Sequence, residues 1–254
     1  MKLVAIANSK GGVGKTTLTT SLAVQASEGG TRPIAVVDTD PTGSLREWYG
    51  RRHNTDGPEQ PELLTGCDTV ADAVDRTIAV GKIWDYVFID TAPGAASEIR
   101  EAMEAADITI IPIRPSSYDI MASETAVGIA DELGVNYLVV VNDAVASDGL
   151  HAEAQAFVAG SGQTIPVAET VVMHRKPHIT AALSGRVARE FRGGSPQSRA
   201  SAAKDIEDIR ELLASWRETR KAVWSTVVKI ATTGTLLFIA GAVWMSVKSN
   251  ISGQ

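Results

Sequence analysis

Short runs of consecutive apolar residues alternate along the chain with longer stretches in which apolar positions recur at helical spacing. Uninterrupted apolar runs are typical of strands that are buried on both faces, as in a parallel sheet covered by helices from both sides. We therefore predict a doubly wound α/β domain with a mostly parallel sheet and helices on both faces. The predicted strands are 2–7, 33–38, 86–90, 108–113 and 137–141, with 164–169 as a weaker candidate.

Helical patterns occupy most of the intervals between these strands, so successive strands can enter the sheet in the same direction. Two segments rich in turn-forming residues are predicted to be surface loops, 51–66 and 192–198. The predicted helices are 15–28, 68–79, 97–106, 118–133, 149–160, 177–191 and 200–221.

Composition places the chain among ordinary globular proteins, because 44% of its 254 residues are hydrophobic and 21% are charged. Its single cysteine, Cys67, excludes an internal disulfide framework and a four-thiolate metal site within one chain. We therefore expect a reducing cytoplasm as its surroundings. The sequence enters its glycine-rich motif almost at once, so we expect neither a signal peptide nor an N-terminal DNA-reading domain.

The net charge of −6 conceals an asymmetry along the chain. Residues 1–170 carry 11 basic and 24 acidic residues, whereas residues 171–221 carry 11 basic and 6 acidic ones. A basic region on an acidic protein favours an anionic polymer or a membrane as partner, and a solvated helix face is the alternative interpretation.

The stretch ANSKGGVGKTT, residues 7–17, connects the first predicted strand to the first predicted helix. Its three glycines let the backbone curl, so that successive N–H groups and the helix N-terminus can point at phosphate oxygens. Lys15 would then reach the terminal phosphates, and Thr16 would offer its hydroxyl to Mg²⁺. The stretch departs from the standard phosphate-loop pattern at Ser9, where glycine is expected, and it carries an additional lysine, Lys10.

Three aspartates stand at the ends of two predicted strands, where parallel strands finish at the same edge of a sheet. Asp38 and Asp40 belong to AVVDTDP, and Asp90 ends YVFID. Residues two apart on a strand point the same way, so Asp38 and Asp40 can both face the phosphate loop if the strand extends that far. Mg²⁺ prefers oxygen ligands, so Asp90 can hold it through water, while one of the other two steadies the metal and the other orients an attacking water. A helix cap is the alternative for each acid taken singly.

Four motifs in order, KGGVGKTT, VVDTDPTGS, FIDTAPG and IIPIRPSSYDI, resemble the ParA/MinD family of ATPases with a deviant Walker A motif. The resemblance covers residues 1–215, and it is strongest to the small ParF-like plasmid partition ATPases. ATPases that assist conjugative DNA transfer are also similar. The resemblance implies a P-loop fold of the SIMIBI type, ATP and Mg²⁺ as cofactors, and a homodimer that encloses ATP between its subunits.

The resemblance also implies roles for single residues. Lys10 would be the signature lysine that crosses the dimer interface to touch the partner subunit's nucleotide, Asp40 would orient water, and Asn142 would contact adenine. Thr42 stands where the family commonly has glutamine. The implied catalytic residues are Lys10, Lys15 and Asp40, and the implied metal residues are Thr16, Asp38 and Asp90. The implied nucleotide-binding residues are Lys10, Gly11, Gly12, Val13, Gly14, Lys15, Thr16, Thr17 and Asn142.

In partition ATPases, basic residues late in the domain bind DNA without sequence preference, through phosphate contacts that depend strongly on salt. Here Arg186 and Arg189 would share one face of the predicted helix 177–191. The predicted DNA-binding residues are Arg175, Lys176, Arg186, Arg189, Arg192 and Arg199.

The segment 230–247 is a run of 18 residues without a charge. A helix of that length spans roughly 27 Å, close to the hydrocarbon thickness of a bilayer. Lysines flank the segment and the basic run 217–221 precedes it, so the positive-inside tendency keeps the preceding domain in the cytoplasm. We predict a tail anchor in the bacterial inner membrane; a helix on the membrane surface, as in MinD, and a buried or oligomer-forming helix are the alternatives. The predicted domains are an ATPase domain 1–215, a basic linker helix 216–229, the hydrophobic helix 230–247 and a tail 248–254.

These features together predict an ATP-dependent dimerising switch, membrane-tethered, whose ATP hydrolysis positions or segregates DNA in plasmid partition or conjugative transfer. Its expected partners are a second copy of the chain, non-specific DNA, a small DNA-binding adaptor or relaxosome-type complex, and the membrane. Two alternatives are a MinD-like protein that positions a protein complex and a non-catalytic scaffold whose nucleotide locks a dimer.

Overall fold

The computed structural model describes residues 1–28, 32–54, 59–146, 149–159 and 166–232. The chain divides into two compact units, Met1–Arg210 and Glu211–Gln254. The first unit contains a sheet and the helices that cover it. In the second unit the described residues are helical, because they continue helix α8 (Pro196–Thr232).

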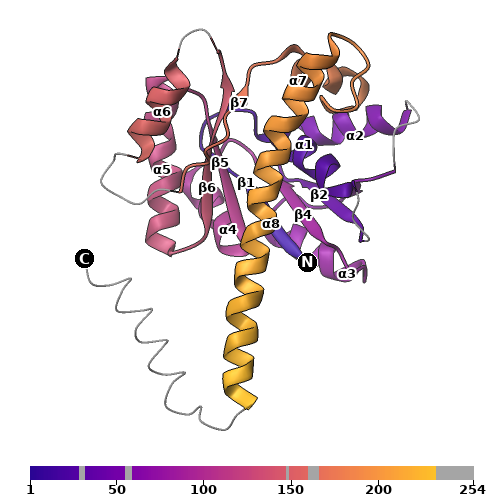
Figure 1. The fold of residues 1–254 in the computed structure, drawn as a ribbon. Helices are drawn as coiled ribbons and strands as arrows, with labels where there is room; N and C mark the ends of the chain where they lie inside the picture. Colours follow the sequence, from indigo (N-terminus) through magenta and orange to yellow (C-terminus); the bar gives the residue numbers. More distant parts are fainter. Residues whose placement is uncertain (29–31, 55–58, 147–148, 160–165, 233–254) are drawn as a thin grey trace. The chain divides into compact units, whose positions relative to one another are not determined.

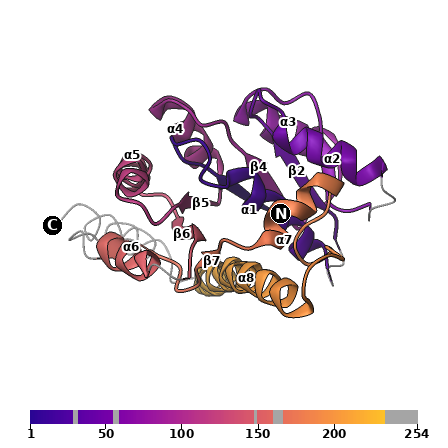
Figure 2. The ribbon, with the colours of Figure 1, turned by 90° about the horizontal axis from the view of Figure 1, so that it is seen from above.

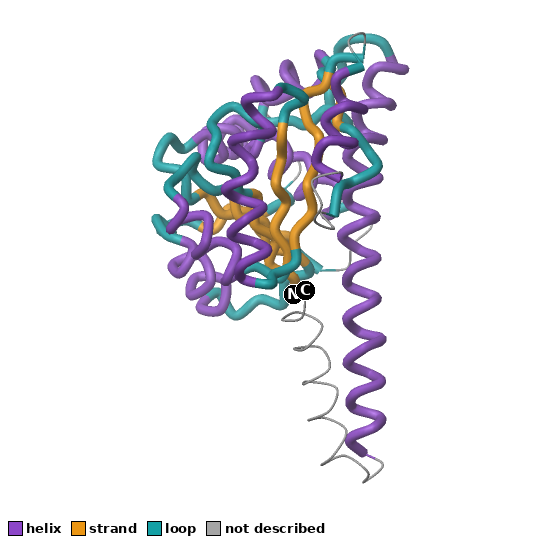
Figure 3. The backbone as a smooth tube through the Cα atoms, turned by 90° about the vertical axis from the view of Figure 1, so that its left-hand side faces the viewer, coloured by secondary structure: helices purple, strands orange, loops and turns teal. Residues whose placement is uncertain are grey.

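A parallel sheet forms the centre of the first unit, and in the described residues it has seven strands in the order β3-β2-β4-β1-β5-β6-β7. Each pair of neighbouring strands is parallel, which confirms the predicted α/β class and the mostly parallel sheet. The strands lie side by side between layers of helices (Figure 3). They are β1 (Lys2–Ile6), β2 (Ile34–Asp38), β3 (Glu62–Leu64), β4 (Tyr86–Asp90), β5 (Ile108–Ile113), β6 (Tyr137–Ala144) and β7 (Val172–Met173).

Helices lie on both faces of this sheet, as the doubly wound prediction requires (Figure 1). Figure 2 shows α4 and α5 on one side of the strands and α7 with the first part of α8 on the other. Besides α8, the described helices are α1 (Lys15–Ser27), α2 (Ser44–Asn54), α3 (Val70–Ala79), α4 (Ala96–Ala105), α5 (Ser117–Leu133), α6 (Leu150–Ala159) and α7 (Lys176–Ala181), with a 3₁₀ turn at Ala182–Ser184.

The uninterrupted apolar runs are buried on both faces, which is why they lack the alternation of a half-exposed strand. Ile111 and Val139 pack with Met103 of α4 and Ala130 of α5 in one core cluster. A second cluster joins residues of β1, β2 and β4 to α3 and includes the fully buried Trp84. The two clusters fix α3, α4 and α5 against the same side of the sheet.

The prediction of a surface loop over 51–66 is wrong at both of its ends. Residues 51–54 form the last turn of α2, and residues 62–64 form the edge strand β3. The buried positions of α2 are Leu45, Trp48 and Arg52, so the helical spacing continues through an arginine. Apolar periodicity cannot reveal a helix whose third inward position is charged.

The predicted helix 177–191 is also wrong beyond its first turns. Helical structure ends at the 3₁₀ turn Ala182–Ser184, and Gly185 follows with a φ of 64°. A Cβ on Gly185 would lie 2.0 Å from the backbone nitrogen of Arg52, so only glycine permits the chain to pass so close to α2. Arg186 and Arg189 therefore do not share a helix face.

The weaker strand candidate 164–169 is replaced by β7, which begins only at Val172. Within the described part of 164–169, Val167 forms an isolated parallel bridge with Val139 of β6. The predicted hydrophobic helix 230–247 lies outside the described residues, apart from its first three positions. Among the residues that are described, none of the helices is long and apolar enough to cross a membrane.

A buried arginine ties α2 to the segment that follows Gly185. Arg52 is 1% exposed and forms a two-pronged ion pair with Glu190, with both nitrogen-to-oxygen distances at 2.8 Å. It also donates to the carbonyl oxygens of Gln60 and Gly185. Trp48 donates from Nε1 to the carbonyl of Arg186. The guanidinium is thus well satisfied, which is the condition under which a buried charge is tolerated.

Glu190→Gln should leave the buried Arg52 guanidinium without a countercharge. We expect the variant to lose about 3 kcal/mol of unfolding free energy, because breaking a buried pair costs far more than breaking an exposed one. The matched control is Glu47→Gln, which breaks the exposed Arg51–Glu47 pair and should change stability by less than about 0.5 kcal/mol. Urea unfolding of both variants tests this, and similar losses in the two would contradict the assigned role of Arg52.

Candidate functional site

The loop between β1 and α1 curls back on itself because two of its glycines have left-handed backbone angles. Gly12 has a φ of 73° and Gly14 a φ of 91°, a region that side chains rarely adopt. A Cβ on Gly14 would lie 2.1 Å from Nδ2 of Asn142. That nitrogen donates a hydrogen bond to the carbonyl oxygen of Val13, at a distance of 2.7 Å. The loop therefore lies in close contact with Asn142 of β6, and it leads directly into the N-terminus of α1.

Lys15, the first residue of α1, returns across this loop. Its ammonium group donates to the carbonyl oxygens of Asn8 at 3.4 Å and Lys10 at 3.1 Å. The residue is 7% exposed, and burial lowers its pKa below the ordinary lysine value, although the charges of Asp90 and Asp40 oppose that effect. A lysine held at the loop mouth in this way is placed to meet the outer phosphates of a nucleotide.

Asp90 ends β4 directly beside the residue that ends β2, because Asp38 and Asp90 are partners in the strand register. Its side chain is fully buried and accepts hydrogen bonds from Oγ1 of Thr16 at 2.6 Å and of Thr19 at 3.3 Å. Burial raises the pKa of Asp90 to about 7, opposed by the Thr16 hydrogen bond and reinforced by the charge of Asp38. The carboxylate and the Thr16 hydroxyl thus meet below the loop.

The two aspartates of the second motif differ in their surroundings. Asp38 is 2% exposed and accepts from the backbone nitrogens of Asp40 at 3.1 Å and Arg46 at 2.9 Å. Burial raises its pKa, although those backbone hydrogen bonds act the other way. Asp40 instead lines the open pocket and accepts from the backbone nitrogen and hydroxyl of Thr42, both at 2.8 Å. The strand β2 ends at Asp38 and does not extend to Asp40, so the condition for both carboxylates to face the phosphate loop is not fulfilled; of the two, Asp40 lines the pocket.

A pocket of about 600 Å³ opens over the loop. The loop side is formed by Gly11, Gly12, Gly14, Lys15, Thr16 and Thr17. The opposite side comes from Asp40, from α2 and from the segment 182–188, including Arg186. The pocket joins backbone N–H groups, a lysine and a helix N-terminus, which together suit a chain of phosphates. Thr16 and the neighbouring aspartates offer the oxygen ligands that Mg²⁺ prefers.

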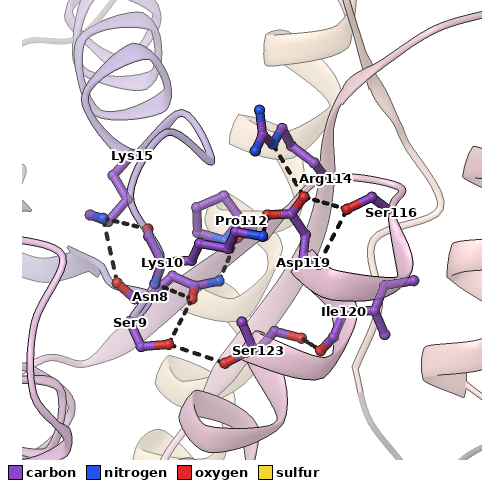
Figure 4. Close-up of polar contacts among 11 residues, drawn as sticks. Asn8, Ser9, Lys10, Lys15, Pro112, Arg114, Ser116, Asp119, Ile120 and Ser123 are labelled. Carbon is purple, nitrogen blue, oxygen red and sulfur yellow. Dashed lines mark hydrogen bonds and ion pairs between the residues drawn. The ribbon is translucent and has the colours of Figure 1, made fainter.

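Lys10 leaves the loop in the direction of α5 (Figure 4). Its ammonium nitrogen lies 2.7 Å from Oδ1 of Asp119, in the first turn of that helix. Arg114 approaches the other carboxylate oxygen, with its Nε at 3.4 Å from Oδ2. Within one subunit, the lysine that makes the motif unusual is therefore paired on its own chain.

Val13, Asn142 and Thr17, which were also predicted to bind nucleotide, lie in or beside the phosphate loop. Val13 is fully buried, and the buried amide of Asn142 supports its carbonyl. This contact holds the loop in place, and the contact of Asn142 with adenine stays a prediction. Thr17 lines the pocket beside Thr16.

The predicted DNA-binding residues are not presented by one element. Arg186 lines the phosphate-loop pocket, Arg175 pairs with Asp205 at 3.1 Å, and Arg189 pairs with Glu28 at the end of α1. Arg199 donates to the carbonyl of Phe191. Lys176 and Arg192 are exposed. Their common role in DNA binding stays a prediction.

Several residues that build the site were not identified from the sequence. Asn8 is fully buried and links the loop to β5, donating to the carbonyl of Pro112 at 2.8 Å and accepting from the backbone nitrogen of Lys10. The guanidinium of Arg46 holds the turn after β2, because it donates hydrogen bonds to the carbonyl oxygens of Asp38 and Asp40. A polar residue directly after a buried strand was an available signal for Asn8. The pairing of Asp119 with Lys10 had no local signal, because 109 positions separate them.

Comparison with known families gives a match over residues 4–237 to the CobQ/CobB/MinD/ParA nucleotide binding domain. A protein named ParA from Rhizobium radiobacter is 32% identical over 121 residues, 47% of this chain and 51% of the relative. The maintenance of carboxysome distribution protein A of Gloeobacter kilaueensis is 28% identical over 223 residues, 85% of this chain and 96% of the relative. The chain thus spans about half the length of the first of these relatives and nearly all of the second.

Solved structures show the same fold at low sequence identity. Apo McdA from Cyanothece superposes with a TM-score of 0.65 at 18% identity, covering 84% of this chain and 99% of that one. The septum site-determining protein MinD of Pyrococcus horikoshii, complexed with Mg-ADP, superposes with a TM-score of 0.61 at 19% identity, covering 84% and 97%.

The raised pKa of Asp90 predicts a specific dependence of stability on pH. An acid with a raised folded pKa costs stability as the pH rises from its unfolded value, near 4, through its folded value of about 7. Asp90→Asn cannot ionise, so it should melt at least about 4 °C above the parent protein at pH 8, in EDTA without nucleotide. The difference should shrink steadily as the pH falls toward 4.

The exposed aspartate Asp75 on α3 provides the control. Asp75→Asn should shift the melting temperature by less than about 1 °C across the same pH range. A benefit of Asp90→Asn that is constant with pH, or absent at pH 8, would contradict the burial of an ionisable carboxyl at this position.

Proposed function

The chain belongs to the CobQ/CobB/MinD/ParA family of nucleotide-binding domains, and on that premise we propose that it is an ATP-hydrolysing positioning switch. In this proposal ATP with Mg²⁺ joins two subunits, the dimer binds a surface, and hydrolysis stimulated by a partner releases it. One observation carries the proposal: Lys15, Thr16 and Asp90 meet under a curled glycine loop, and Asp40 faces the same pocket.

The residues divide the work of binding and hydrolysis. Lys15 and the N–H groups of the loop bind the phosphates, and Thr16 with Asp90 would hold Mg²⁺, which neutralises phosphate charge when it is bound. Asp40 orients the attacking water at the edge of the pocket, in the position that Thr42 fixes by two hydrogen bonds. Asp38 stabilises this turn, because its carboxylate accepts a hydrogen bond from the backbone nitrogen of Arg46. The complex of MinD with Mg-ADP supports the choice of cofactors.

The cargo in this proposal is DNA, in plasmid partition or conjugative transfer. The ParA relative and the basic residues Arg175, Lys176 and Arg192 support a DNA surface, with a small DNA-binding adaptor or a relaxosome-type complex as stimulating partner. The uncharged segment 230–247 supports a second surface, the cytoplasmic face of the bacterial inner membrane. A protein with both surfaces would tether DNA to the envelope.

The positioning of a protein assembly is the second candidate. The match to the maintenance of carboxysome distribution protein A covers 85% of this chain, a larger share than the match to the ParA relative covers, and its name concerns the distribution of carboxysomes. A nucleotide-locked scaffold without hydrolysis is disfavoured by Asp40, which is kept at the pocket edge where a water-orienting group belongs.

ATP turnover measured alone, with DNA and with liposomes tests the switch. The parent protein should be slow alone and faster with the surface that it uses, while Asp40→Ala should be slower by about 100-fold in every condition, since it loses the group that orients water. Exposed Asp75→Ala is the matched control and should behave as the parent. Equal turnover by the parent and Asp40→Ala would reject the switch as assigned.

The membrane surface has a test of its own. A cysteine introduced by Ser252→Cys should react with a membrane-impermeant maleimide in intact cells once the outer membrane is permeabilised. Exposed Gln197→Cys, at the start of α8, should stay unlabelled until the inner membrane is broken. Labelling of both positions only after lysis would exclude a spanning anchor.

A further inference from the structure

The pairing of Lys10 within its own subunit conflicts with its implied role across the dimer interface. Asp119 is 3% exposed and its carboxylate holds the Lys10 ammonium at 2.7 Å. The three N–H donors of the ammonium group share one nitrogen, so keeping both contacts would bring the Asp119 carboxylate and the partner subunit's phosphates together as neighbouring like charges. One of the two contacts has to give way when the dimer forms.

Hydrogen bonds anchor the loop backbone on both sides of Lys10, whereas the Lys10 side chain is partly exposed. Asn8 bonds to β5, and the Ser9 hydroxyl donates to the carbonyl of Ala122 in α5 at 3.1 Å. The backbone nitrogen of Lys10 donates to the Asn8 side chain at 3.0 Å. The Lys10 side chain itself is 30% exposed, so it can swing toward solvent on its four-carbon stem without unfolding the loop.

The Asp119 carboxylate has other polar partners besides Lys10. Ser116 caps the first turn of α5 and its hydroxyl contacts the Asp119 carboxylate, while Arg114 approaches the same group. Burial acts to raise the pKa of Asp119, but the contacts with Lys10 and Ser116 and the charge of Arg114 outweigh it, so the pKa is lowered. After Lys10 leaves, a second cation and a hydroxyl remain, which avoids the high cost of a buried charge without partners.

We propose that Asp119 is a positioning residue for Lys10: it holds the lysine within the free subunit, and ATP-dependent dimerisation exchanges this ion pair for the partner subunit's nucleotide. This inference rests on the proposed ATP-enclosing dimer. Each dimer needs two such exchanges. The Lys10–Asp119 ion pair therefore weakens dimerisation, because one such pair must be broken in each subunit. Dimer formation then depends on a nucleotide whose phosphates replace the carboxylate as the partner of Lys10.

The exchange predicts that Asp119→Asn dimerises more tightly than the parent. A partly exposed ion pair changes the population of the open lysine by roughly threefold per subunit. The dissociation constant of the dimer should then fall about tenfold, because both subunits gain. It is measured by sedimentation of the full chain with Mg²⁺ and a non-hydrolysable ATP analogue, in the same mild detergent for every sample.

Two control variants separate the exchange from loosening of α5. Ser116→Ala removes the cap of the same helix turn but leaves the carboxylate facing Lys10, so its dimer constant should stay within about twofold of the parent. Asp119→Glu keeps the charge and should stay closer to the parent than Asp119→Asn. If Asp119→Asn does not fold, Asp119→Ser takes its place, and melting temperatures are recorded for all variants.

The outcomes distinguish this inference from the proposed function. Failure of the parent chain to dimerise with the ATP analogue would reject the dimeric switch itself. A dimerising parent with an unchanged or weaker Asp119→Asn dimer would overturn only the exchange, as would a Ser116→Ala dimer tightened as much as the Asp119→Asn dimer.

Discussion

The site depends on the register of three parallel strands. Pairing of β4 with both β1 and β2 places Asp90 opposite Ile6 on one side and Asp38 on the other. The loop that leaves β1 therefore starts beside the carboxylate that ends β4, and the turn that leaves β2 carries Asp40 to the same edge. A one-residue shift in either pairing would turn these side chains to the opposite face of the sheet and separate the carboxylates from the loop.

The same arrangement opposes stability. Asp38 and Asp90 are buried where their pKa values rise, and Lys15 is buried where its pKa falls. All three shifts follow chiefly from burial of charged groups in one small region. A bound metal and polyphosphate would supply opposite charges to each of them. The apolar strands and the satisfied Arg52–Glu190 pair stabilise the structure around this region. The protein can therefore keep a site in which the burial of charged groups is unfavourable without a ligand.

Sequence patterns predicted the parts of the protein that depend on local chemistry. The five strong strands and the loop were recognisable because burial on both faces and a curled glycine turn each require particular residue types. The end of the 177–191 prediction at Gly185 was not recognisable, since it depends on the backbone of Arg52 far away in the sequence. The pairing of Lys10 with Asp119 was missed for the same reason, because the pairing of β1 with β5 is what brings α5 beside the loop. Neither contact leaves a periodic signal.

We propose that Lys10 acts between subunits while Lys15 and Thr16 bind nucleotide within one subunit. The most direct test is Lys10→Ala, compared with the parent chain in ATP binding and in ATP-dependent dimerisation. We expect the variant to bind ATP as a monomer with nearly the parent affinity and to sediment as a monomer at every ATP concentration. A variant that still dimerises with ATP would rule out the assigned role of Lys10.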